Sequence, residues 1–125
     1  MVEKSILLEA AGGRLRLEPD ENAWCRVTLE VAEDRDVELG ADSLSTVRMR
    51  LLNALGPLRG LVSGEIDGRA VYHVLSLFER HCTLYAADAP EGRRLFIQDA
   101  GGKVLGAITI PNDRRRAWAS ALSAK

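Results

Sequence analysis

The fold is decided by residues 44–57, whose sequence is LSTVRMRLLNALGP. Apolar residues recur in this stretch with the period of a helix: Leu44, Val47, Leu51, Leu52 and Leu55. These positions fall on one face of an α-helix. Asp42 or Ser43 can cap its start, and Gly56-Pro57 is a typical stop signal. Residues 47–51 also alternate as a strand would, but the length of the stripe and the stop signal favour a central helix over residues 43–55.

On both sides of this stretch, apolar and polar residues alternate with the period of two that is typical of half-buried strands. Turns such as Gly12-Gly13 and Asp67-Gly68 favour hairpins between them. A second helical stripe, which includes Trp118 and Leu122, predicts a C-terminal helix over residues 113–123, with Asn112 or Asp113 as its cap. The predicted fold class is therefore α+β. We expect a curved, mostly antiparallel sheet of about seven or eight hairpin-connected strands, able to form a half-open barrel, with two helices.

Length and composition limit the class of protein. A chain of 125 residues with 46% hydrophobic and 28% charged residues fits one soluble globular domain, which we place at residues 1–125. No apolar run approaches the ~20 residues of a membrane-spanning helix, and the N-terminal residues do not have the pattern of a signal peptide, so we expect a cytoplasmic protein. The net charge of −1 argues against nucleic acid as the partner.

The near-zero net charge conceals two opposed halves. Residues 1–45 carry eleven acidic and five basic side chains, and residues 46–125 carry seven acidic and twelve basic ones. Three of the basic residues, Arg114, Arg115 and Arg116, occupy the first turn of the predicted C-terminal helix, where the helix dipole disfavours cations. They are candidate binding residues for an anionic partner, and the alternative is that they pair with the acidic N-terminal half or remain solvated, as exposed charges commonly do.

The candidates for chemistry are few. His73 and Cys82 are the fallback reactive residues, but they can meet only by cross-strand pairing, and His81 points away from its neighbour Cys82 on a strand. We expect Cys25 and Cys82 to be reduced and buried. The spacing of cysteines and histidines matches no zinc motif, and no glycine-rich loop opens a helix as a phosphate-binding loop does. We therefore predict no metal, no cofactor and no catalytic residue.

The C-terminal third resembles the end of pleckstrin-homology domains. The resemblance rests on Leu95–Ile97, a turn, Lys103–Ile110, and then Trp118 with Ala121 and Leu122 in a charged helix. It implies a bent seven-stranded antiparallel sheet, plugged at one end by the helix, with the tryptophan in the core. Phosphoinositide-binding members of that family carry a basic pattern across their first hairpin, which Lys4, Arg14 and Arg16 match here. The resemblance thus adds these three residues to the candidate binding residues.

Three functions follow as hypotheses. The first is a non-catalytic binding or adaptor module that acts through protein–protein contacts, with a protein partner or a second copy of the chain, using a sheet edge, hairpin tips or the basic helix. The second is a small-ligand-binding protein or small enzyme with a pocket between the sheet and the central helix, using His73 or Cys82. The third is peripheral binding to anionic lipid through Lys4, Arg14 and Arg16.

Overall fold

The structure is a computed structural model that describes residues 4–31 and 35–123. Its described residues form nine strands, two α-helices and one 3₁₀ turn, in this order: β1 (Ile6–Ala10), β2 (Gly13–Pro19), β3 (Trp24–Val31), β4 (Arg35–Ser43), α1 (Leu44–Leu55), β5 (Gly64–Ile66), β6 (Arg69–Ser76), β7 (Thr83–Ala89), β8 (Gly92–Gln98), β9 (Val104–Pro111), η1 (Asn112–Arg114) and α2 (Arg115–Ser123). The predicted α+β class, with antiparallel strands and two helices, is confirmed.

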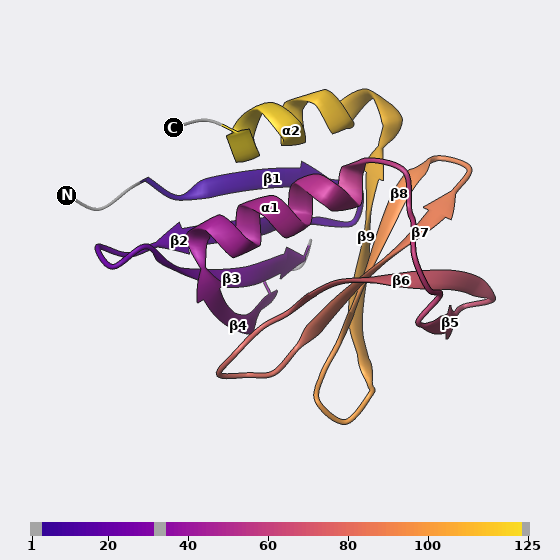
Figure 1. The fold of residues 1–125 in the computed structure, drawn as a ribbon, viewed down its shortest axis with the longest axis horizontal. Coiled ribbons are helices and arrows are strands. Elements are labelled where there is room, and N and C mark those ends of the chain that lie inside the picture. The colour runs from indigo at the N-terminus through magenta and orange to yellow at the C-terminus, as the bar shows by residue number, and fades with distance from the viewer. Residues whose placement is uncertain (1–3, 32–34, 124–125) are drawn as a thin grey trace.

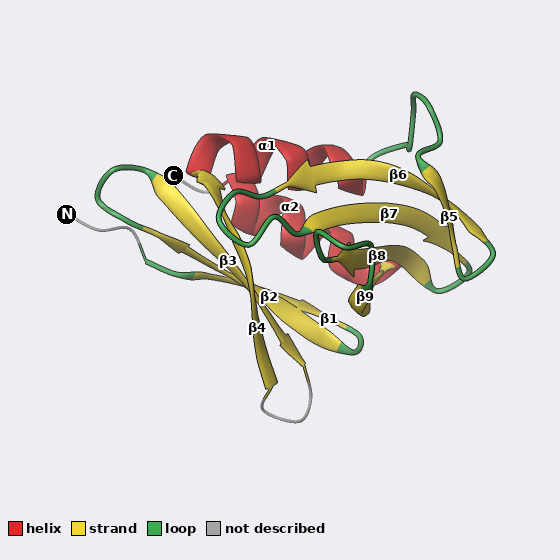
Figure 2. Ribbon diagram, turned by 90° about the horizontal axis from the view of Figure 1, so that it is seen from below, coloured by secondary structure: helices red, strands yellow, loops and turns green. Residues whose placement is uncertain are grey.

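The strands form two antiparallel sheets instead of the single sheet expected. The first has the order β1-β2-β3-β4 and the second β5-β6-β7-β8-β9. The chain leaves the first sheet when it enters α1, so β4 and β5 are never adjacent. Figure 1 shows the two sheets crossing, with α1 drawn in front of the first sheet and α2 running beside β1, and Figure 2 shows the curvature of β6, β7 and β8. Neither sheet closes into a barrel within the described residues, and the nine strands exceed the seven that the pleckstrin-homology resemblance implies.

The two halves of the chain repeat one arrangement, a four-stranded antiparallel meander followed by a helix. The first unit is β1–β4 with α1, and the second is β6–β9 with α2. The tripeptide Leu-Gly-Ala occurs at residues 39–41 and again at 105–107. In each unit the strand register shifts at this leucine: Leu39 is the extra residue opposite β3, and Leu105 is the extra residue opposite β8. The β-bulge therefore recurs at the same place in both units.

Each unit also makes the same contacts with the other one. Helix α1 packs against α2 and β6, and α2 packs against β1, so each helix covers the first strand of the other unit. Reciprocal backbone hydrogen bonds join Ala41 of β4 to Phe78, and a second reciprocal pair joins Thr109 of β9 to Ala11. Gly40 is required for the first approach, because a Cβ atom there would lie 2.2 Å from the carbonyl oxygen of Phe78. Each unit therefore makes equivalent contacts with the other, as two units related by an approximate two-fold axis do.

Helix α1 follows the sequence prediction closely. Ser43 caps the helix, because its side chain accepts a hydrogen bond from the Thr46 amide at 3.2 Å, and the helix ends before Gly56. The buried residues of α1 form one stripe, as predicted: Leu44, Val47, Leu51 and Ala54.

The C-terminal helix begins differently from the prediction. We expected a helix over 113–123 with Asn112 or Asp113 as its cap, but a 3₁₀ turn occupies residues 112–114 and α2 starts at Arg115. Pro111 precedes the turn, and no side chain makes a capping hydrogen bond there. A 3₁₀ turn is a common way for a chain to enter an α-helix, since its tighter bonds satisfy some of the first amide groups.

One main core lies between the sheets and helices. Trp118 and Leu122 of α2 are buried in it, and the Trp118 indole donates a hydrogen bond to the Glu9 carbonyl of β1 at 2.6 Å. Cys25 and Cys82 are free and buried in the same core, as expected. A smaller cluster of Ile66, Val71, Ala87 and Phe96 lies beside β5.

Candidate functional site

A cleft of about 420 Å³ lies between the C-terminal half of α1, the loop that follows it and strand β6; we call it the α1–β6 cleft. Its volume is in the lower part of the range for ligand pockets. Leu52, Leu58 and Val74 supply apolar lining. The polar and charged side chains in the lining are Arg50, Asn53, Arg59, Tyr72 and His73. This position, between the sheet and the central helix, is where the second functional hypothesis placed a pocket.

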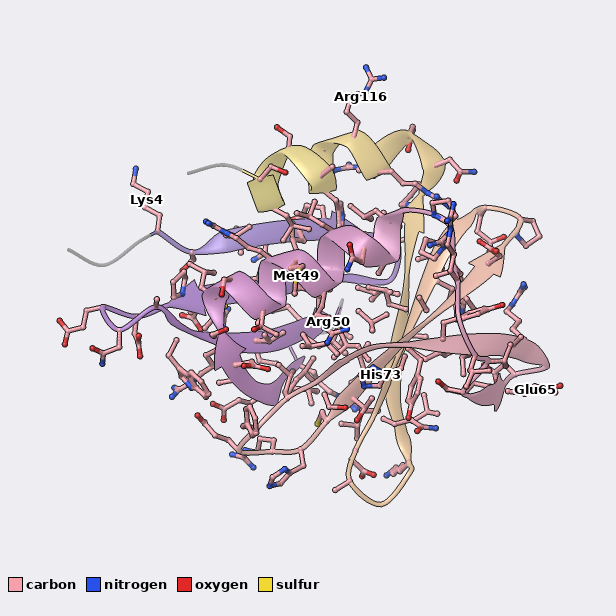
Figure 3. All side chains as sticks on the ribbon, viewed as in Figure 1. Lys4, Met49, Arg50, Glu65, His73 and Arg116 are labelled. Carbon is pink, nitrogen blue, oxygen red and sulfur yellow. The ribbon has the colours of Figure 1, made fainter. Side chains whose placement is uncertain are left out.

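The charged side chains that line the α1–β6 cleft are all positive. Arg50 and Arg59 are both exposed, and no aspartate or glutamate lines the cleft. In the described part of the chain, neither guanidinium makes an ion pair. Figure 3 shows Arg50 of α1 and His73 of β6 next to each other. The cleft therefore presents two fixed positive charges to a ligand.

The pKa of His73 is lowered in this position, although part of the residue is exposed to solvent. Partial burial of the imidazole lowers its pKa below the usual value, and the positive charge of Arg50 lowers this pKa further. The imidazole Nε2 lies 2.8 Å from the Ser76 hydroxyl, and the ring packs edge-on against Tyr85. His73 and Ser76 share a face because the register of β6 shifts between residues 73 and 75, whereas three residues of regular strand would place them on opposite faces.

The cleft exists because β5 covers only the first part of β6. The pairing with β5 involves Arg69, Ala70 and Val71, and the Ser63 amide donates to the Val71 carbonyl at 2.8 Å. Backbone groups along a strand point alternately to its two sides, so the amide and carbonyl of His73 point the same way as those of Val71. No backbone group in the described residues pairs with His73 on that side.

Cys82 does not belong to this site. It is buried in the main core, whereas His73 is exposed and has Tyr85 as its cross-strand partner. Burial raises the pKa of the Cys82 thiol, and the nearby Asp99 carboxylate raises it further, which is the opposite of an activated thiol. The structure therefore does not bring the two fallback reactive residues together.

Arg114 at the end of η1 and Arg115 and Arg116 at the start of α2 have different environments. Arg115 donates a hydrogen bond to the Leu55 carbonyl at 3.1 Å, at the C-terminal end of α1. The start of α2 thus lies beside the end of α1, where the α1 dipole favours the cation that the α2 dipole disfavours. Arg114 and Arg116 are exposed, and Figure 3 shows Arg116 pointing into solvent from the side of α2 away from the sheets.

A buried arginine that sequence reasoning missed completes the end of α1. Arg93 of β8 is 3% exposed, and its Nη1 donates to the carbonyl oxygens of Ala54 and, at 2.7 Å, of Gly56. Its Nη2 donates to Asp88 at 3.0 Å. Since Ala54 and Gly56 also line the α1–β6 cleft, Arg93 positions one wall of it.

The basic first hairpin is neutralised by its neighbours. Arg14 donates to Glu30 and, at 3.0 Å, to Glu9, and Arg16 also pairs with Glu30. The hydrogen bonds to Glu30 and Glu9 raise the pKa of Arg14. The hydrogen bond from Arg14 is the main cause of the lowered pKa of Glu30. Lys4 is exposed and points away from the molecule (Figure 3). The acidic half of the sequence thus neutralises its own arginines on the solvent face of the first sheet.

Arg50, Arg59 and Tyr72 were also missed by the sequence analysis. Arg50 was passed over because it lies outside the apolar stripe of its helix, and Arg59 because it follows the stop signal. One available signal was the position of Arg50 at the margin of the buried stripe, where a side chain can reach a neighbouring element. The contact with β6 depends on packing between segments distant in sequence.

Comparison with known protein families and with curated proteins gives no match to this chain. Across residues 4–31 and 35–123, no three His, Cys, Asp or Glu side chains gather as ligands of a metal would. No helix in the same ranges is long and apolar enough to cross a bilayer.

Proposed function

We propose that this protein is a non-catalytic binding module that holds an acidic ligand group in the α1–β6 cleft. The observation that carries the proposal is the lining itself, which contains Arg50 and Arg59 but no carboxylate. Guanidinium groups bind carboxylate and phosphate through paired hydrogen bonds, and a partly enclosed site strengthens these bonds. The imidazole of His73, whose pKa is lowered, is a further hydrogen-bonding group in the lining of the same site.

The first functional hypothesis, an adaptor that acts through protein contacts, is compatible with this site, because a sheet edge borders the cleft. The basic first hairpin is a weaker candidate, since both of its arginines already have carboxylate partners. Arg114 of η1 and Arg116 of α2 remain candidate binding residues; both are exposed, and neither lines the α1–β6 cleft.

A titration with citrate, followed by the amide signals in NMR spectra, tests the proposal. In the wild type, we expect citrate to shift the amide signals of Asn53 and His73. The double variant Arg50→Gln, Arg59→Gln should bind citrate about tenfold more weakly, because two surface ion pairs contribute up to ~1 kcal/mol each.

The matched control is the double variant Arg114→Gln, Arg116→Gln, which makes the same change in net charge at η1 and the start of α2. It should bind citrate as the wild type does. Equal losses in the two double variants would mean that net charge alone attracts citrate, and the α1–β6 cleft would then not be the binding site.

A further inference from the structure

The open edge of β6 points to the kind of ligand that the cleft takes. We propose that the occupant of the α1–β6 cleft is an extended segment of a protein partner, which adds a strand to β6 and directs acidic side chains to Arg50 and Arg59. This inference rests on the proposed function, because it needs the same cationic cleft. It specifies how the ligand is recognised, through its backbone as well as its charge.

The first support is the mismatch between β5 and β6. Strand β5 has three residues and β6 has eight, so most of β6 has a neighbour only on the β7 side. The stretch beyond Val71 lines the cleft with three consecutive residues, Tyr72, His73 and Val74. A cleft bordered by a continuous strand edge suits a ligand that is itself extended.

The second support comes from the equivalent edge in the other unit. Strand β1 is also an edge strand under a helix, but the Trp118 indole of α2 donates to its Glu9 carbonyl. Helix α1 packs against β6, and its buried side chains are all apolar: Leu44, Val47, Leu51 and Ala54. None of these four can donate a hydrogen bond. Helix α2 thus supplies a hydrogen-bond donor to one carbonyl on the edge of β1, whereas the buried side chains of α1 supply none to the edge of β6.

The third support is the chemistry around the edge. Alternate residues of an added strand would face the same side, so acidic residues at every second position can approach the arginines together. Leu52 and Leu58 lie in the same cleft and can contact apolar side chains of the added strand. The loop that leads to β5 also presents Leu61, which is 94% exposed, and Val62, which is 51% exposed. A partner segment that alternates acidic and apolar residues matches this lining.

The test uses a blocked seven-residue peptide of alternating valine and glutamate. Isothermal titration calorimetry should detect its binding to the wild-type protein, and citrate should compete with it. A valine–glutamine peptide should bind at least tenfold more weakly, because it lacks the charges that Arg50 and Arg59 attract. The amide signals of Tyr72, His73 and Val74 should shift in NMR spectra when the acidic peptide binds.

Two N-methylated versions of the acidic peptide examine the backbone pairing. One carries methyl groups on the first alternate set of amides and the other on the second set. When the glutamates of the added strand face the arginines, only one of the two sets of amides points toward β6, and the other set points away from it. The version methylated on the set that faces β6 should lose binding at least tenfold, and the other version should keep most of its binding. Equal binding by both versions and the parent peptide would overturn strand addition, even if citrate binding shows that the cationic site exists.

A charge reversal in both the protein and the peptide tests whether the peptide binds at the edge of β6 and not at another strand edge. The variant Arg50→Glu should bind the valine–glutamate peptide more weakly and gain affinity for a valine–lysine peptide. Since Arg50 is exposed, this variant is expected to fold. Peptide-induced shifts confined to β4 or β9 would also overturn the proposal. Absence of both citrate and peptide binding would refute the proposed function as well.

Discussion

The buried arginine of β8 gives the sharpest test of how the cleft is held together. Arg93 supplies charged donors to the carbonyls of Ala54 and Gly56, at the end of α1. We predict that Arg93→Met, which keeps most of the side-chain volume, destabilises the protein by about 3 kcal/mol. Hydrogen bonds to a charged group contribute roughly 1.5–3 kcal/mol each to stability, and Arg93 makes two of them to the end of α1. Part of this loss is offset, because the variant no longer has to desolvate a buried charge on folding.

This loss is large compared with the total stability of a domain of this size. Native proteins are stable by about 5–15 kcal/mol, and 3 kcal/mol corresponds to roughly a hundredfold change in the unfolding equilibrium. The helix dipole adds to the effect, because the carbonyl end of α1 loses a nearby cation. The last turn of α1 should open more often, so its amides should exchange faster with solvent than those of its first turn.

Urea denaturation, followed by the fluorescence of Trp24 and Trp118, measures the free energy of unfolding. The matched control is Arg94→Met, one residue along the same strand. Arg94 donates one hydrogen bond to Thr109 at 2.7 Å and lies over the Phe96 ring at 5.3 Å, so we expect a loss of about 1 kcal/mol. Equal losses in the two variants, or a loss below about 1 kcal/mol for Arg93→Met, would refute the assigned role.

Two further predictions concern the titratable residues. Burial raises the pKa of the Cys25 thiol to about 12 and also raises that of Cys82, so neither thiol should react with a disulfide reagent at pH 8 until the protein unfolds; rapid release of one equivalent by the folded protein would contradict this. Because the pKa of His73 is lowered in the folded state, the unfolded state takes up its proton first as the pH falls. The wild type should therefore lose more stability than His73→Gln between pH 7.5 and pH 5.5 in urea denaturation, and equal losses would disprove the lowered pKa.

The local elements could be predicted from the sequence because each has its own period. The apolar stripe of α1, its Ser43 cap and its Gly56 stop all lie within one short stretch, and the structure has the helix over 44–55. The strand alternation and hairpin turns are equally local. The stretch before the Asp67-Gly68 turn is the exception, because its apolar residues begin at Leu61 but β5 begins only at Gly64, and Leu61 extends into solvent.

The candidate site was predicted only in part. The sequence indicated a pocket between the sheet and the central helix and singled out His73, which lies there. It also grouped Arg114, Arg115 and Arg116 as one basic feature, although Arg115 binds the end of α1 and the other two are exposed. Neighbours in sequence were assigned one role because nothing local distinguishes their environments.

What the sequence determined by itself is the type and approximate place of most elements, because hydrophobic periodicity acts within a few residues; nine strands form in the described residues where about seven or eight were expected. The tertiary structure decided the rest: two sheets instead of one, and arginines of the first sheet paired with that sheet's own carboxylates. It also placed Arg50 beside His73 and Arg93 at the end of α1, contacts that join residues far apart in the chain. Such contacts depend on how complete elements pack, and no short window of sequence records that packing.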